Sequence, residues 1–179
     1  MRVFITSDNI ISALGFTTAE NIEAITAYRS GITLTANSHI SATPVMAATI
    51  ERTVLEKRFK ALSDKDYYSP AEQLLILSIT DTLQQQHLSQ PESGTALILS
   101  TTKGNVAALG HRSNIPDEAF LSHTSRRVAD YFGIDSKDTF LISNACISGI
   151  SAIIMAARLI DEGQYSKAIV AGCDVLSPF

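Results

Sequence analysis

Three predicted strands and the helix that joins two of them restrict the fold more than any other feature. Residues 95–101 form a continuous apolar run, which is typical of a strand covered on both faces in a parallel sheet. Residues 139–143 and 167–172 predict two more strands, joined by a helix over 145–162 that Gly163 ends. Parallel strands need such a crossover, so we predict a layered α/β fold with a mostly parallel mixed sheet.

Capping residues indicate where two further helices begin. Thr17 is followed three residues later by Glu20, and Ser69 by Glu72, the spacing of a capping box. The first of these helices places three apolar side chains near one face, which we expect to be buried: Ile22, Ile25 and Tyr28.

Predicted helices and a predicted strand also occupy other parts of the chain. The helix after Ser69 has a broad apolar surface over 74–83 and should end before Pro91. Another helix precedes Gly133, using Val128, Ala129 and Phe132. Residues 3–6 form an apolar run that predicts a short first strand.

Length and composition indicate one globular domain over residues 1–179. With 45% apolar and 18% charged residues, the chain is neither disordered nor a coiled coil. A net charge of -4, from 14 basic and 18 acidic residues, gives no overall field for a nucleic-acid backbone. Two cysteines are too few for a disulfide scaffold, and no signal peptide or membrane span is evident. We therefore expect a cytoplasmic protein without a metal or cofactor.

One segment, residues 51–66, is rich in charge. It is consistent with a solvated helix and its loop. The alternative is a docking patch for an acidic partner, formed by Lys57, Arg58 and Lys60.

The residues that most resemble a catalytic site are 144–149, where the predicted strand at 139–143 ends and a helix begins. That helix is apolar nearly all round, which predicts an interior position; its apolar residues include Ile147, Ile150, Ile153, Ile154, Ala156, Ala157, Leu159 and Ile160. Its first turn is small or polar and leaves unpaired N–H groups around the Cys146 sulfur, where the helix dipole favours a thiolate. Spacing alone favours a small core residue at Cys146 over a nucleophile, because free cysteine is among the most buried residue types.

The size of the dipole effect limits the nucleophile hypothesis. About 1.4 kcal/mol lowers the pKa of an ordinary thiol by about one unit, which leaves most of it protonated at neutral pH. A nucleophile here would therefore need a nearby base or cation, and donors aimed at the developing oxyanion.

The stretch from Ile142 to Gly149, followed by Ala152, 158–160, Gly163 and 168–172, resembles the nucleophile region of β-ketoacyl-acyl-carrier-protein synthases. Residues 3–15, the capped helix and 30–32 are similar to the opening of the same family. The resemblance is specific over 125–174 and weak between the two regions.

This resemblance implies the N-terminal half of a thiolase-like fold, which the family builds from two similar α/β halves and usually pairs into a homodimer or heterodimer. Cys146 aligns with the cysteine that accepts an acyl group from an acyl carrier protein thioester, and its N–H would be an oxyanion donor. A malonyl thioester is then decarboxylated and extends the fatty acyl chain by two carbons. Whether the pathway makes fatty acids or polyketides stays open.

The main departure from the family is the missing base. Family members use two histidines and a lysine of a second half, and the sequence context of His39, His87, His111 and His123 does not match those motifs. We therefore predict that this polypeptide alone does not condense acyl chains. A position after a strand, rather than before a helix, indicates that Cys173 is structural.

Two alternatives belong to other classes of protein. A non-catalytic partner subunit of the chain-length-factor type would share the fold, but such subunits typically lack the cysteine. A redox-sensing protein would need an exposed thiol and usually a resolving cysteine, for which Cys173 is distant in the sequence.

Overall fold

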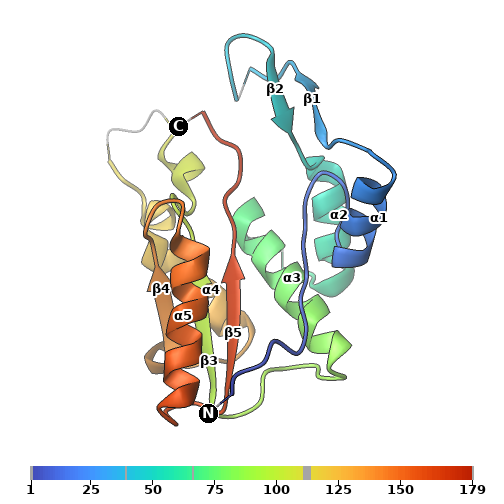
Figure 1. Cartoon of the computed structure of the whole chain (residues 1–179). Coiled ribbons are helices and arrows are strands. Elements are labelled where there is room, and N and C mark those ends of the chain that lie inside the picture. The colour runs from blue at the N-terminus through green and yellow to red at the C-terminus, as the bar shows by residue number, and fades with distance from the viewer. Residues whose placement is uncertain (1, 39, 66, 111–113, 179) are drawn as a thin grey trace.

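The strand expected at 95–101 forms the middle of a parallel sheet. The computed structural model describes residues 2–38, 40–65, 67–110 and 114–178. In it, β3 (Thr95–Ser100) lies between β4 (Thr139–Ile142) and β5 (Lys167–Gly172), and all its residues are buried (Figure 1). Both neighbours run parallel to β3. The prediction of a layered α/β fold is therefore confirmed.

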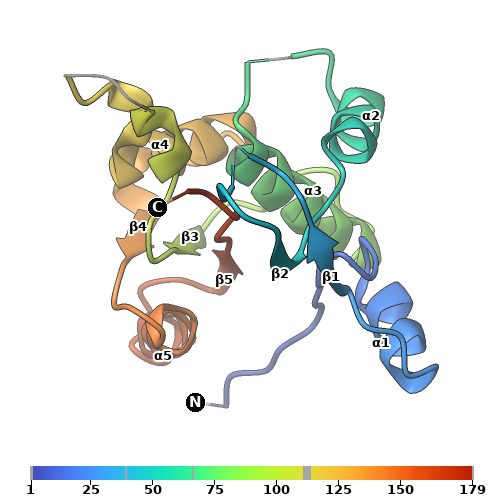
Figure 2. The same ribbon diagram turned by 90° about the horizontal axis from the view of Figure 1, so that it is seen from above.

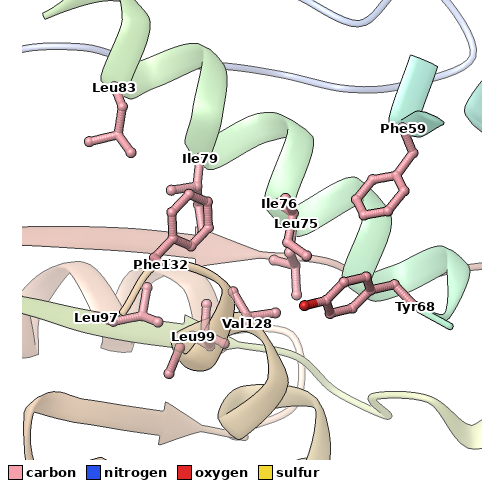
Figure 3. Packing of buried hydrophobic residues seen from close by; sticks show 11 residues of the cluster. Phe59, Tyr68, Leu75, Ile76, Ile79, Leu83, Leu97, Leu99, Val128 and Phe132 are labelled. Atoms are coloured by element: carbon pink, nitrogen blue, oxygen red, sulfur yellow. The ribbon is translucent and has the colours of Figure 1, made fainter. Parts of the chain in front are cut away.

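One face of this sheet is covered by two helices, α3 (Pro70–Gln85) and α4 (Leu121–Tyr131). Leu97 and Leu99 of β3 point to this face and belong to the larger hydrophobic cluster (Figure 3). Helices and connecting segments supply the rest of that cluster: Phe59, Tyr68, Leu75, Ile76, Ile79, Leu83, Val128, Ala129 and Phe132. The apolar surface predicted over residues 74–83 therefore lies in the core. The three apolar residues of the helix before Gly133 lie there too: Val128, Ala129 and Phe132.

The opposite face is covered by α5 (Ser148–Asp161), so the molecule has helices on both sides of the sheet (Figure 2). Ala96 and Ile98, which alternate with the leucines of β3, pack against Ala152, Ala156 and Leu159 of this helix. The side chains of Ala152 and Ala156 are small enough to let α5 lie close to the strands.

The capping boxes form at both predicted helix starts. Thr17 and Ser69 accept from the backbone N–H of the residue three positions on, and the glutamates there accept from the cap backbone, starting α1 (Thr18–Thr26) and α3. Glu72 is itself buried, and its Oε2 accepts from the Ser69 N–H at 2.8 Å. Each box satisfies two donors that a helix start would otherwise leave unpaired.

The remaining elements lie outside the central layers. A hairpin pairs β1 (Ile32–Thr35) with β2 (Val45–Ala48), and α2 (Arg52–Leu62) packs against α3. Short 3₁₀ helices occupy the connections: η1 (Val106–Leu109), η2 (Asp117–Ala119) and η3 (Ser136–Asp138). Over the described ranges, no helix is both long and apolar enough to cross a membrane.

The prediction of a strand at residues 3–6 is wrong. The segment has no strand pairing with described residues, and the side chains of Phe4 and Ile5 are 74% and 82% exposed. Side-chain amides at the C-terminal end of α3 hold this part of the chain instead, since Gln85 donates to the Asp8 carbonyl and Gln86, the C-cap, donates to the Thr6 carbonyl. An apolar run becomes a strand only where a sheet edge is available to pair with it.

The apolar face expected to anchor α1 is also not buried. Ile22, Ile25 and Tyr28 are exposed, whereas Asn21 and Ala24 are buried. The Asn21 side-chain amide lies within hydrogen-bond distance of carbonyls in the preceding loop, those of Ile10, Gly15 and Thr17. Polar contacts with that loop therefore decide which side of α1 faces inward.

The helix α5 departs from its prediction in two ways. It begins at Ser148 rather than at 145, because Ala145 adopts a positive φ that a helix does not allow. It is also not interior, since Ile147, Ile150, Ile153 and Ile154 are between 47% and 63% exposed. Only a narrow stripe of α5 meets the sheet.

Candidate functional site

Three loops meet at the carboxyl edge of the parallel sheet, the edge at which open α/β sheets bind ligands. The loop after β4 contains Cys146, the loop after β3 begins at Thr101, and Asp174 follows β5. The Thr101 N–H donates to the Ile142 carbonyl, and the Cys173 N–H donates to the Ser100 carbonyl, each at 3.2 Å. These bonds continue the hydrogen bonding between neighbouring strands past the strand ends. They hold the first residues of the three loops close together.

Cys146 lies in a tight turn between β4 and α5. Its side chain is exposed, and α5 starts two residues later, at Ser148, with Ile147 as the N-cap. Ala145 has φ of 47°, a left-handed conformation that is uncommon for a residue with a Cβ. The thiol is therefore just before a helix and outside its regular turns, whereas the sequence predicted it within the first turn.

The hydroxyl of Ser148 closes this turn. Its Oγ accepts from the Asn144 N–H at 2.8 Å and donates to the Ala145 carbonyl at 2.7 Å. Two longer backbone bonds of 3.2 Å run in the same turn, from the Ile147 N–H to Asn144 and from the Ser148 N–H to Ala145. Ser148 is itself buried, so its hydroxyl is confined between these two partners.

The amides at the start of α5 are free to act as donors. Among the described residues, none accepts a hydrogen bond from the backbone N–H of Cys146, Gly149 or Ile150. These groups lie at the positive end of the α5 dipole. The arrangement can stabilise an oxyanion that develops on a thioester carbonyl.

Asp174 joins the loops after β3 and β5. Its carboxylate accepts from the hydroxyls of Thr101 and Thr102, at 2.8 and 2.6 Å, and from the N–H groups of Thr102 and Lys103. Burial alone would raise the pKa of Asp174, but the hydrogen bonds from Thr102, Thr101 and Lys103 together lower it. Sequence reasoning missed this junction, although a polar run directly after the buried strand was a usable signal.

Cys173 differs from Cys146 in its surroundings. It packs against the larger hydrophobic cluster, and burial, with a smaller contribution from the charge of Asp174, raises the pKa of its thiol to about 12. A thiol that stays protonated attacks disulfides and sulfenic acids slowly. Cys173 is thus a poor resolving partner for a redox-sensing cysteine.

The predicted basic patch lies on α2, on the far side of α3 from β4 and α5, the two elements that flank Cys146 (Figures 1 and 2). Lys57 and Lys60 are exposed and form no ion pair with described residues. Arg58 is engaged within the chain, with its guanidinium 4.3 Å from the centre of the Phe16 ring and 3.9 Å from Glu20. Lys57 and Arg58 border an open hollow of about 550 Å³, which Thr53, Val54 and Ala61 complete. The structure therefore does not bring the patch and the cysteine into one site.

The histidines do not form a site with Cys146 in the described chain. His87 follows α3 in a left-handed conformation, and the Nδ1 of His123 is 3.7 Å from the buried Glu72 carboxylate. His39 and His111 lie outside the described residues. Within the described ranges, no group of three or more acidic, histidine or cysteine side chains could hold a metal ion.

Comparison with known proteins gives a distant match. No family model matches the chain. Three proteins of Streptococcus agalactiae, from strains of serotypes III, V and Ia, are each called β-ketoacyl-[acyl-carrier-protein] synthase III. Each is 23% identical over 141 residues, covering 66% of this chain and 44% of the matched protein. The chain thus spans less than half the length of these curated relatives, and it is distantly similar to ketosynthases of this type.

Proposed function

We propose that this chain is the N-terminal half of a 3-oxoacyl-[acyl-carrier-protein] synthase, in which Cys146 accepts an acyl group from a carrier-protein thioester. The observation that supports it best is the position of Cys146. An exposed thiol lies two residues before α5, whose first amides have no acceptor among the described residues, at the carboxyl edge of a parallel sheet in a chain distantly similar to a synthase.

The acyl transfer uses the groups around the turn. The Cys146 thiolate attacks the thioester carbonyl and forms a carbon–sulfur bond, while the carbonyl electrons move to oxygen. The N–H of Cys146 donates to that oxyanion. The oxyanion then collapses, the bond to the carrier sulfur breaks, and the carrier thiolate takes up a proton.

The condensation that follows needs groups beyond this turn. A malonyl thioester loses carbon dioxide, and its carbanion attacks the acyl carbonyl on Cys146, which releases the Cys146 thiolate and a 3-oxoacyl product two carbons longer. We assign the histidines for this step to a second α/β half, in the same polypeptide or a separate one. Packing of that half on α5 would cover the exposed isoleucines Ile150, Ile153 and Ile154.

The test of acyl transfer is a mass measurement on three proteins. The wild type and Cys173→Ala should each gain one acyl group when incubated with an acyl carrier thioester, and Cys146→Ala should gain none. Absence of the adduct on the wild type, or its appearance on Cys173, would reject the proposal. Because we assign the histidines for condensation to the second half, residues 1–179 alone should yield no 3-oxoacyl product when malonyl carrier protein is added.

The carrier protein is acidic in the family that the chain resembles, and we assign its docking to Lys57, Arg58 and Lys60. Lys57 and Lys60 are the cleaner probes because Arg58 also packs on Phe16. Lys57→Glu and Lys60→Glu should slow acyl loading of Cys146 at low salt and lose this effect at high salt. Lys137→Glu, on an exposed lysine of η3, is the matched control. Equal loading rates for all three variants would leave α2 as a solvated helix.

A further inference from the structure

The basic side chains of α2 differ in what they already contact. Lys57 and Lys60 form no ion pair with described residues, whereas Arg58 has two partners within the chain. The Arg58 guanidinium lies 4.3 Å from the centre of the Phe16 ring, and its Nη2 is 3.9 Å from the Oε1 of Glu20. Arg58 also borders the open hollow on α2, together with Lys57. One of the basic groups that an acidic partner would meet there is therefore already paired with a carboxylate of the same molecule.

The hydrogen bonds of the α1 capping box hold the Glu20 carboxylate in this position. Its Oε2 accepts from the backbone N–H groups of Phe16 and Thr17, and its Oε1 is the oxygen that faces Arg58. Gly15 leaves room for the carboxylate, since a Cβ at this position would lie 2.9 Å from Oε2. Arg58 thus has a carboxylate at a fixed place beside it before any partner arrives.

The ion pair between Arg58 and Glu20 is open to solvent, so a partner can displace it. The two side chains are 48% and 45% exposed, respectively. Exposed pairs of this kind are weak and are screened by salt. A carboxylate of a docking partner can therefore replace Glu20 at Arg58, but only in competition with it.

We propose that Glu20 is an internal competitor of the acidic partner for Arg58, so that its carboxylate weakens docking on α2. This inference rests on the proposed function for the identity of the partner, a carrier protein. The competition itself does not, because any acidic ligand of this surface would meet the same carboxylate.

The test measures binding of a fluorescent hexaglutamate peptide by anisotropy at low salt. Glu20→Gln removes the charge and keeps the capping hydrogen bonds, since glutamine also serves in a capping box. It should bind the peptide about two- to fivefold more tightly than the wild type, the range expected for loss of an exposed ion pair. The gain should disappear at high salt.

Glu23→Gln is the matched control on the same helix. It removes the same charge from an exposed position that has no ion pair with described residues, so its gain should be smaller. In an Arg58→Gln background, Glu20→Gln and Glu23→Gln should bind the peptide alike, because the contested basic group is gone.

A second measurement needs no variant, in case Glu20→Gln does not fold. When the peptide is added to the wild type, the carboxyl NMR signal of Glu20 should move and that of Glu23 should not. Two stationary signals in the presence of bound peptide would contradict the competition.

The outcomes separate the two proposals. Equal affinity of folded Glu20→Gln and Glu23→Gln, or a peptide that binds to none of the proteins, would overturn the competition. If Glu20→Gln binds the peptide more tightly than Glu23→Gln but the wild type takes no acyl group from a thioester, the competition stands and the proposed function fails.

Discussion

The two faces of β3 are covered very differently. On one face, α3 and α4 bury a continuous cluster of leucine, isoleucine, valine and aromatic side chains. On the other, α5 meets the strands through two alanines and a leucine and leaves its isoleucines half exposed. The first face is therefore a fully packed core. The second combines a thin contact with the strained turn that contains Cys146, so the less completely packed face is the one suited to chemistry and association.

The largest expected effect contrasts the same substitution on the two faces. Ile76→Ala, at a fully buried position of α3, should lower the free energy of unfolding by about 2–5 kcal/mol, from lost burial and the cavity left behind. Ile153→Ala, on the exposed side of α5, should change it by less than about 0.5 kcal/mol.

Urea unfolding measured at several protein concentrations checks this contrast. An equally large, concentration-dependent loss in Ile153→Ala would mean that a second copy of the chain covers α5.

An intermediate effect is expected at Asp174. Because its folded pKa is lowered, its stabilisation is present above the pKa of an unfolded aspartate and is lost as the pH falls through the folded value. The carboxylate is partly exposed, so solvent screening limits the effect to about 1 kcal/mol.

Asp174→Asn should therefore be less stable at neutral pH and show a flatter decline in acid, measured by thermal unfolding between pH 6 and 2. The control is Asp135→Asn, an exposed ion-pair residue that should match the wild type. Identical acid profiles for the wild type and Asp174→Asn would mean that the junction contributes no stability.

The smallest effect is expected at the strained turn. Ala145→Gly should stabilise the protein by about 0.5 kcal/mol, because relief of the positive φ outweighs the greater freedom of glycine in the unfolded chain. The same substitution at Ala157, inside α5, should instead cost about 1 kcal/mol. Chemical unfolding of both variants tests the opposite signs, and a loss of stability in Ala145→Gly would indicate that the turn is unstrained.

Local signals predicted the elements that depend on neighbouring residues. The capping boxes at Thr17 and Ser69, the buried strand at 95–101 and the helix before Gly133 all form where the sequence placed them. Each rests on a hydrogen-bond pattern or periodicity within one segment, which the chain retains in most tertiary settings.

The wrong predictions share a different cause. The run at 3–6, the apolar face of α1 and the isoleucines of α5 were all expected to be paired or buried. Apolar character shows which side chains gain from burial, but burial also needs an opposing surface in the same molecule. The sequence analysis also missed the partners of Asp174 and of the Ser148 hydroxyl, since these bonds join atoms whose geometry depends on where the strands and turn lie.

The sequence by itself determined the order of β3, α4, β4, α5 and β5 and located a cysteine between a strand and a helix, because periodicity and capping act over a few residues. Only the tertiary structure decided that β3 lies between β4 and β5 and that α5 buries one narrow stripe. It also decided that Cys146 is held outside the helix, whose first amides have no acceptor among the described residues. These outcomes depend on contacts between distant segments, whose energies no local pattern records.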